Sequence, residues 1–178
     1  MSQPVRAQVL TATVTSLNEP FEVALTPNGD YAYVTNGAGW VSAINTATNK
    51  ITTTIFDRNG PFGVAVTPNG NYVYVTNGGS GSVSVISTAT NKVTKTISVG
   101  NGPFGVAVTP NGAYAYVTNF GSNSVSVIST SSNTVVATIT VGSNPQSLAI
   151  TPDNEYVYVT NFGAATVSVI NTATNKVT

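Results

Sequence analysis

The segment NYVYVTNGGSGSVSVIST, residues 71–88, decides the fold, because near copies of it occur four times in the chain. Its tetrapeptide Tyr-Val-Thr-Asn begins at Tyr33, Tyr74, Tyr116 and Tyr158, so successive copies start 41, 42 and 42 residues apart. The flanking sequence repeats as well, as FGVAVTPNG before the second copy and VSVISTATNK after its glycines. A period of about 40 residues indicates a chain of equivalent supersecondary units that bury their apolar faces on one another.

Each unit is predicted to contain four short strands. In the second unit, Val, Ile, Thr and Tyr dominate four segments, as strands prefer: residues 62–67, 72–77, 82–88 and 93–99. Pro68 presets the backbone for a turn and Gly70 supplies a positive φ, so the chain reverses between the first two segments. Asn154 replaces this glycine in the fourth unit, and asparagine also tolerates a positive φ. No window shows the 3.6-residue period of a helix, so the chain is predicted to be all-β.

Both faces of these predicted sheets carry apolar or small side chains. A two-layer sandwich, in which one face of each sheet is exposed to solvent, does not explain this pattern. Small four-stranded sheets that stack face to face at this period describe a β-propeller. The prediction is therefore a β-propeller of four antiparallel four-stranded blades in a single domain, residues 1–178. The repeats are placed at approximately residues 20–58, 59–100, 101–142 and 143–178.

The outermost strand of the fourth blade is incomplete, since its equivalent begins at Lys176 and the sequence ends at Thr178. Residues 9–16 match an outer strand, and we expect this N-terminal strand to close the last blade, in its own chain or in a partner's. The first case gives a four-bladed ring. The second favours a homodimer of eight blades, at about 45° each, within the usual range of propellers. An open filament and a piece of a longer propeller remain alternatives.

Composition excludes several functions. Only 7% of residues are charged, and six basic residues balance six acidic ones, so nucleic acid is not expected as a partner. The chain has no cysteine and no histidine, which excludes disulfides, zinc sites built on those residues and a Ser-His-Asp triad. No metal or other cofactor is predicted. The sequence shows neither an apolar run long enough for membrane insertion nor a signal-peptide pattern.

The repeated Tyr-Val-Thr-Asn, with PFGVAVTPNG before it and VSVI-x-TATNK after it, resembles the YVTN family of β-propeller repeats. The resemblance covers the chain from about Val9 to Thr178. It implies propeller domains of surface-layer and cell-surface proteins, with a structural or adhesive role and an extracellular location. More distantly, the sequence is similar to lactonase-like and quinone-dehydrogenase propellers. The propellers of this family have about seven blades, so four repeats are a departure.

Departures from the repeat mark candidate binding residues. Trp40 stands where the other units have Ser or Thr, and Phe120 and Phe162 follow the motif asparagine where the first two units have Gly. All three are expected in loops at one end of the blades. They form either a contact patch for a protein, a glycan or another subunit, or simple packing against neighbouring loops.

The remaining polar candidates favour structure over catalysis. The motif asparagines recur in every blade, which predicts a structural role in bonding local backbone: Asn36, Asn77, Asn119 and Asn161. Glu19, Glu22 and Asp57 are an alternative cation site, although too few oxygen ligands accompany them. We therefore expect a non-enzymatic structural or interaction module. The alternatives are an enzyme-like propeller of the lactonase or quinone-dehydrogenase type and a designed or excised repeat fragment without a function of its own.

Overall fold

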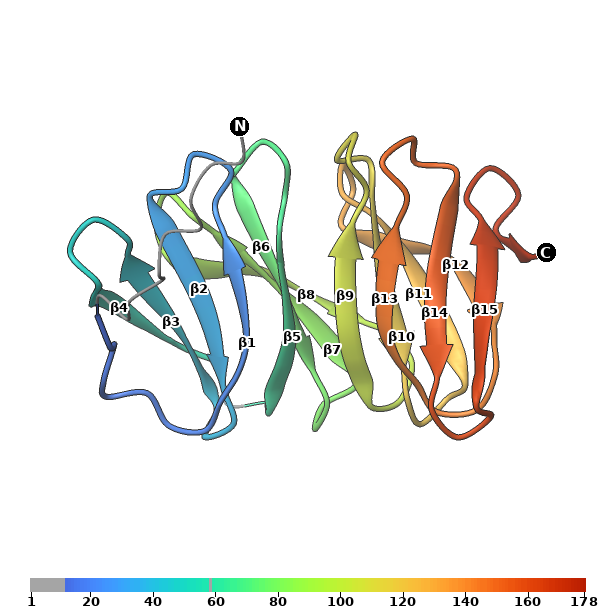
Figure 1. Cartoon of the computed structure of the whole chain (residues 1–178), viewed down its shortest axis with the longest axis horizontal. Helices are drawn as coiled ribbons and strands as arrows, with labels where there is room; N and C mark the ends of the chain where they lie inside the picture. The colour runs from blue at the N-terminus through green and yellow to red at the C-terminus, as the bar shows by residue number, and fades with distance from the viewer. Residues whose placement is uncertain (1–11, 58) are drawn as a thin grey trace, which may run out of the picture.

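A computed structural model describes residues 12–57 and 59–178 as four antiparallel sheets of four strands each (Figure 1). In chain order the strands are β1 (Pro20–Leu25), β2 (Tyr31–Asn36), β3 (Trp40–Asn45), β4 (Lys50–Phe56), β5 (Pro61–Val66), β6 (Tyr72–Asn77), β7 (Ser82–Ser87), β8 (Lys92–Ser98), β9 (Pro103–Val108), β10 (Tyr114–Asn119), β11 (Ser124–Ser129), β12 (Thr134–Thr140), β13 (Pro145–Ile150), β14 (Tyr156–Asn161), β15 (Thr166–Asn171) and β16 (Lys176–Val177). Each sheet takes its strands in sequence order. Among the described residues, no helix is long and apolar enough to cross a membrane.

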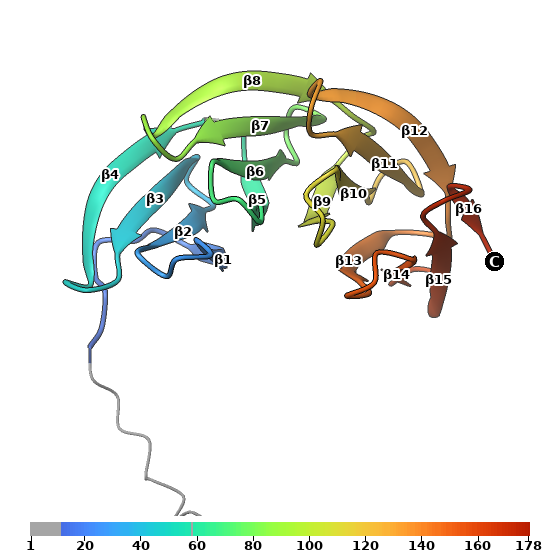
Figure 2. The same ribbon diagram turned by 90° about the horizontal axis from the view of Figure 1, so that it is seen from above.

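The four sheets follow one another around an open arc (Figure 2). The first strand of each sheet (β1, β5, β9 and β13) lies toward the centre, and β4, β8 and β12 form the outer rim. This is the arrangement of propeller blades, and it confirms the predicted all-β propeller built from four four-stranded blades.

The turn chemistry follows the sequence prediction. Between β5 and β6 the Gly70 N–H donates to the Thr67 carbonyl at 2.8 Å, and Gly70 has a φ of 74°. In the fourth blade Asn154 makes the same bond to Thr151 at 2.9 Å with a φ of 67°. Asparagine therefore replaces glycine here without changing the turn.

The hydrophobic cores lie between the blades, because each sheet is too thin to have an interior of its own. The core between the first two blades combines Tyr33 and Val41 of one with Val73 and Ile86 of the next. Equivalent positions build the cores between the second and third blades and between the third and fourth. Both faces of the inner blades are thus covered, as the sequence pattern indicated.

The two end faces of the arc lack this cover. Tyr158 and Val167 of the fourth blade are 47% and 56% exposed, whereas their counterparts in the other blades are at most 1% exposed. On the first blade Val23 and Leu25 are 60% and 61% exposed. The arc therefore presents an apolar face at each end.

The expected closing strand does not form within the chain. The fourth sheet consists of β13 to β16, and β16 is only two residues long. Residues 12–16 form no strand, so closure of the ring by the chain's own N-terminal strand is wrong for them; residues 9–11 lie outside the described residues. The segment instead borders a hollow with the β3–β4 turn of the first blade, next to Asn49. Closure in a partner remains a prediction.

Candidate functional site

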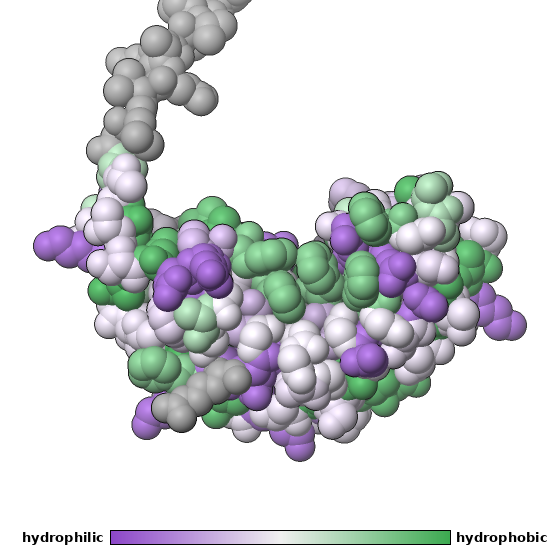
Figure 3. Space-filling view, turned by 90° about the horizontal axis from the view of Figure 1, so that it is seen from below, coloured by the Kyte–Doolittle hydropathy of each residue, from purple (hydrophilic) through white to green (hydrophobic). Residues whose placement is uncertain are grey.

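A cluster of phenylalanines lies where the inner strands meet. Phe21, Phe62 and Phe104 occupy the same repeat position at the start of β1, β5 and β9. Their ring centroids are 5.0 to 5.5 Å apart, and each ring contacts the other two. We call these three residues the phenylalanine cluster. Apolar side chains gather across the middle of the face seen from below (Figure 3), and Phe21 remains 53% exposed.

A bulge at the start of each inner strand places these rings. Pairing of β5 with β6 skips from Pro61 to Val64, which leaves Phe62 and Gly63 outside the regular register. The Thr76 hydroxyl accepts a bond from the Gly63 N–H at 2.7 Å and donates to the Phe104 carbonyl of the next blade at 2.6 Å. One threonine thus anchors both the bulge and the neighbouring inner strand, and the bulge can re-aim the aromatic side chain toward the centre.

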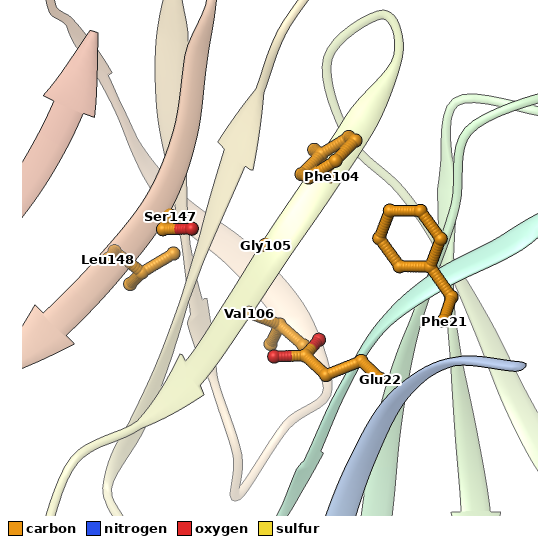
Figure 4. Close-up of a pocket in the computed structure, with 7 residues that line it drawn as sticks. All are labelled: Phe21, Glu22, Phe104, Gly105, Val106, Ser147 and Leu148. Atoms are coloured by element: carbon orange, nitrogen blue, oxygen red, sulfur yellow. The ribbon is translucent and has the colours of Figure 1, made fainter. Parts of the chain in front are cut away.

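A cavity of about 180 Å³ adjoins the cluster between β1, β9 and β13 (Figure 4). Phe21 and Glu22 line one side, and Ser147 and Leu148 line the other. Glu22 Oε2 accepts a hydrogen bond from the Val64 N–H at 2.9 Å. Partial burial raises the pKa of the Glu22 carboxyl, and the bond from Val64 opposes that rise. The cavity therefore combines aromatic surface with one carboxylate.

The structure does not bring the three predicted patch residues together. Trp40 packs edge-on against Phe56 at 6.5 Å, on the first blade. Phe120 lies 6.4 Å from Phe104, at the border of the phenylalanine cluster. Phe162 is 72% exposed on the fourth blade, and no aromatic contact joins two of these three residues. Of these three residues, only Phe120 lies against the phenylalanine cluster.

The sequence reasoning missed the phenylalanine cluster, although a signal was present. A Pro-Phe pair opens the inner strand of the first three repeats, and Gln146 replaces the phenylalanine in the fourth. In the sequence, a large apolar residue beside a strand-initial proline looks like ordinary strand sequence. Its exposure depends on the bulge, which the alternation of residues does not show.

The four motif asparagines are buried at the ends of β2, β6, β10 and β14, at most 1% exposed. Asn77 donates from Nδ2 to the Ser84 hydroxyl of β7 at 2.9 Å, and Asn119 and Asn161 make the same bond to their serines. Asn36 donates to Ser42 and also to the Val34 and Trp40 carbonyls. The expected bonding to local backbone is therefore seen at Asn36, while the shared contact is a side-chain bond across the hairpin.

The carboxylates predicted as an alternative cation site are engaged separately. Asp57 accepts from the Ser84 hydroxyl and from Asn59 Nδ2, both at 3.0 Å, and Glu22 accepts from Val64. Glu19 lies against Gly37. In the part of the chain that the structure describes, no three acidic, histidine or cysteine side chains are grouped to hold a metal ion.

Blades in sequence order around a central cavity define the chain as a β-propeller protein. It belongs to the lactonase, 7-bladed beta-propeller family, whose model matches residues 88–178. Hydrazine synthase from Kuenenia stuttgartiensis is a similar solved structure, 29% identical, with a TM-score of 0.86 over 96% of this chain and 51% of that one.

A functionally unknown protein from Desulfotomaculum acetoxidans DSM 771 has the same fold. It is 23% identical, with a TM-score of 0.79 over 89% of this chain and 54% of that one. The chain thus spans about half the length of both structures. No curated protein matches the sequence.

Proposed function

We propose that the chain is a non-catalytic interaction module, which uses a rigid stack of blades to present the phenylalanine cluster to a partner. The observation that carries the proposal is the exposed aromatic ring of Phe21, held against Phe62 and Phe104 at the centre of the arc. Phe62 and Phe104 are partly buried beside it and extend its apolar surface, and contiguous apolar surface marks binding sites in many proteins. The resemblance to surface proteins supports an extracellular setting.

The chemistry around the cluster favours a glycan over a protein as the partner. Aromatic rings offer flat apolar surface to the C–H face of a sugar, and the adjoining carboxylate of Glu22 accepts hydrogen bonds from hydroxyl groups. The cavity beside Phe21 measures about 180 Å³, so it has room for a small chemical group but not for several large side chains of a protein partner. Sites of this kind combine apolar walls with a few polar groups that set orientation.

Titration with soluble oligosaccharides tests the proposal. We expect at least one of cello-, chito- and xylo-oligosaccharides to bind, and Phe21→Ser to weaken that binding about tenfold, because the substitution removes a stacking face and its apolar area. Phe162→Ser is the matched control, since Phe162 is also exposed but lies outside the cluster. Calorimetry that detects no binding, or an equal loss in both variants, would contradict the proposal.

An enzyme-like propeller is the second candidate, and Glu22 favours it. Its raised pKa in a small central cavity is a property of general acids and bases. The family is named for lactonase activity, and one similar structure is hydrazine synthase.

Hydrolysis of a simple lactone, such as δ-gluconolactone, separates the two candidates. The interaction module predicts no turnover above the uncatalysed rate. The enzyme candidate predicts measurable turnover that Glu22→Gln lowers about 100-fold, through loss of acid-base catalysis. Glu19→Gln should leave that turnover unchanged, because Glu19 lies against Gly37, outside the cavity.

A further inference from the structure

Besides its apolar core, each junction between successive blades contains the same two side-chain hydrogen bonds. A tyrosine hydroxyl of one blade donates to an asparagine in the outer turn of the next: Tyr33 to Asn91 at 2.8 Å, Tyr74 to Asn133 at 2.6 Å and Tyr116 to Asn175 at 3.3 Å. A threonine hydroxyl also donates to the inner strand of the next blade, 2.6 Å from the carbonyl in each case: Thr35 to Phe62, Thr76 to Phe104 and Thr118 to Gln146. The junction is therefore directional, with donors on one blade and acceptors on the following one.

The fourth donor set has no acceptor on a following blade, and the Thr160 hydroxyl donates instead to the Ser147 carbonyl of its own blade at 3.2 Å. Tyr158 and Thr160 occupy the donor positions of the last blade, and both are exposed. The hydroxyl of Tyr158 makes no hydrogen bond to any described residue. Because the same positions are buried in the other three blades, this face is a complete donor half without its counterpart.

The matching acceptor half is exposed on the first blade. Asn49 occupies the turn position of Asn91, Asn133 and Asn175 and has the same left-handed backbone, with a φ of 55°. Its side chain is exposed, as is Phe21, whose carbonyl corresponds to the acceptor of Phe62. Val23 and Leu25 extend this half with apolar surface. The two ends of the arc are thus complementary in hydrogen bonding and in apolar area.

The outer edge of the fourth blade is open as well. Strand β15 pairs with β14 over its full length, but β16 covers only Ile170 and Asn171. On that side, residues 166–168 have no ladder partner within the described ranges. An unpaired edge of this kind is a template for a strand from another chain.

Residues 12–16 have the sequence that this edge requires. Aligned with β8, Val14 takes the position of Ile97, which pairs with Val83 and is buried in the core between blades. Val83 corresponds to Val167, so the same register sets Val14 opposite the exposed Val167. The segment already lies beside Asn49, next to the acceptor half of its own first blade.

We propose that a second copy of this chain docks its first blade on the fourth blade and adds its residues 12–16 as the outer strand beside β15. The contact repeats a junction that the chain makes three times. In it, the Tyr158 hydroxyl donates to the Asn49 side chain of the second copy, and the Thr160 hydroxyl donates to the Phe21 carbonyl of that copy. Two such contacts close a pair of chains into eight blades of about 45° each, a number that propellers adopt.

Cysteine crosslinking tests the register directly, because the chain contains no cysteine of its own. Val14→Cys and Val167→Cys chains, mixed and oxidised, should form a covalent species of twice 18.2 kDa, since directly paired residues suit a disulfide. Neither variant oxidised alone should give it. Val136→Cys is the control partner for Val14→Cys. Val136 is 53% exposed, close to the 56% of Val167, but it lies on β12, away from the proposed contact.

Mass in solution and a pair of substitutions complete the test. Multi-angle light scattering at micromolar concentration should give two chains per particle. Tyr158→Phe and Asn49→Gly, which keeps the left-handed turn, should each weaken association about five- to tenfold, and the double variant no further. A larger assembly with the Val14–Val167 crosslink supports the contact. A monomer, or crosslinking equal to the Val136 control, overturns it and leaves the face to further blades of a longer chain.

Discussion

Replacing Tyr74 by Ala is expected to lower the free energy of unfolding by about 3–5 kcal/mol, the usual cost of removing a large buried aromatic side chain. Tyr74 is 1% exposed in the core between the second and third blades, and its hydroxyl bonds Asn133 at 2.6 Å. The substitution opens a cavity and also leaves the Asn133 acceptor unpaired. Urea denaturation followed by far-UV circular dichroism measures the change.

Tyr158→Ala is the matched control, because it removes the same side chain at the same repeat position on an end face. Tyr158 is 47% exposed, so its loss should cost about 1 kcal/mol or less when the protein is dilute enough to have the mass of one chain. At concentrations where two chains associate, the same substitution should cost more, since the proposed contact buries it. Equal costs in dilute solution would show that the cores do not lie between blades.

Stability is also expected to fall steeply between pH 10 and pH 12. Burial is the main cause that raises the pKa of Tyr74 and of Tyr116 to about 12, with a smaller contribution from Tyr72 and Tyr114 respectively. In the unfolded chain these groups titrate near pH 10. Below pH 10 both states hold the proton. Above it the unfolded state loses the proton while the folded state keeps it, so the free energy of unfolding decreases as the pH rises.

The expected loss is on the order of 2 kcal/mol for each of the two tyrosines by pH 12. Denaturation midpoints between pH 9 and pH 12 give the slope, and absorbance at 295 nm reports tyrosine ionisation. Tyr74→Phe should flatten the slope by about the share of one residue, and the double variant Tyr74→Phe/Tyr116→Phe by about twice as much. A slope that neither substitution alters would contradict burial of these two tyrosines as its cause.

The blades could be predicted from the sequence because each element carries its own local signal. Alternating Val, Ile and Thr indicate strands, and Pro-Asn-Gly indicates the turn that Gly70 makes. Strands β6 and β7 have no charged side chain on either face. Because both faces must then be buried, the sheet is expected to stack between two neighbouring sheets. Because all four repeats show the same signals, the fold prediction does not depend on any single segment.

The candidate site was harder to predict, because it depends on geometry that the repeat does not encode. Phe62 reaches the centre through a bulge anchored by Thr76, and neither the bulge nor the bond to the next blade has a pattern in the sequence. Trp40 and Phe162 stood out as departures from the repeat, yet they lie on separate blades. Departures from a repeat identify unusual residues, while the site lies at a position that three repeats share.

The directional junction bears on how such a chain can change in length over evolution. Each repeat carries one tyrosine and threonine for its successor and one asparagine and inner-strand carbonyl for its predecessor. Duplication or loss of a whole repeat by unequal recombination therefore creates a junction that is already compatible, with no compensating substitution. Blade number can then drift by whole units, and selection acts on curvature and closure rather than on the contacts themselves.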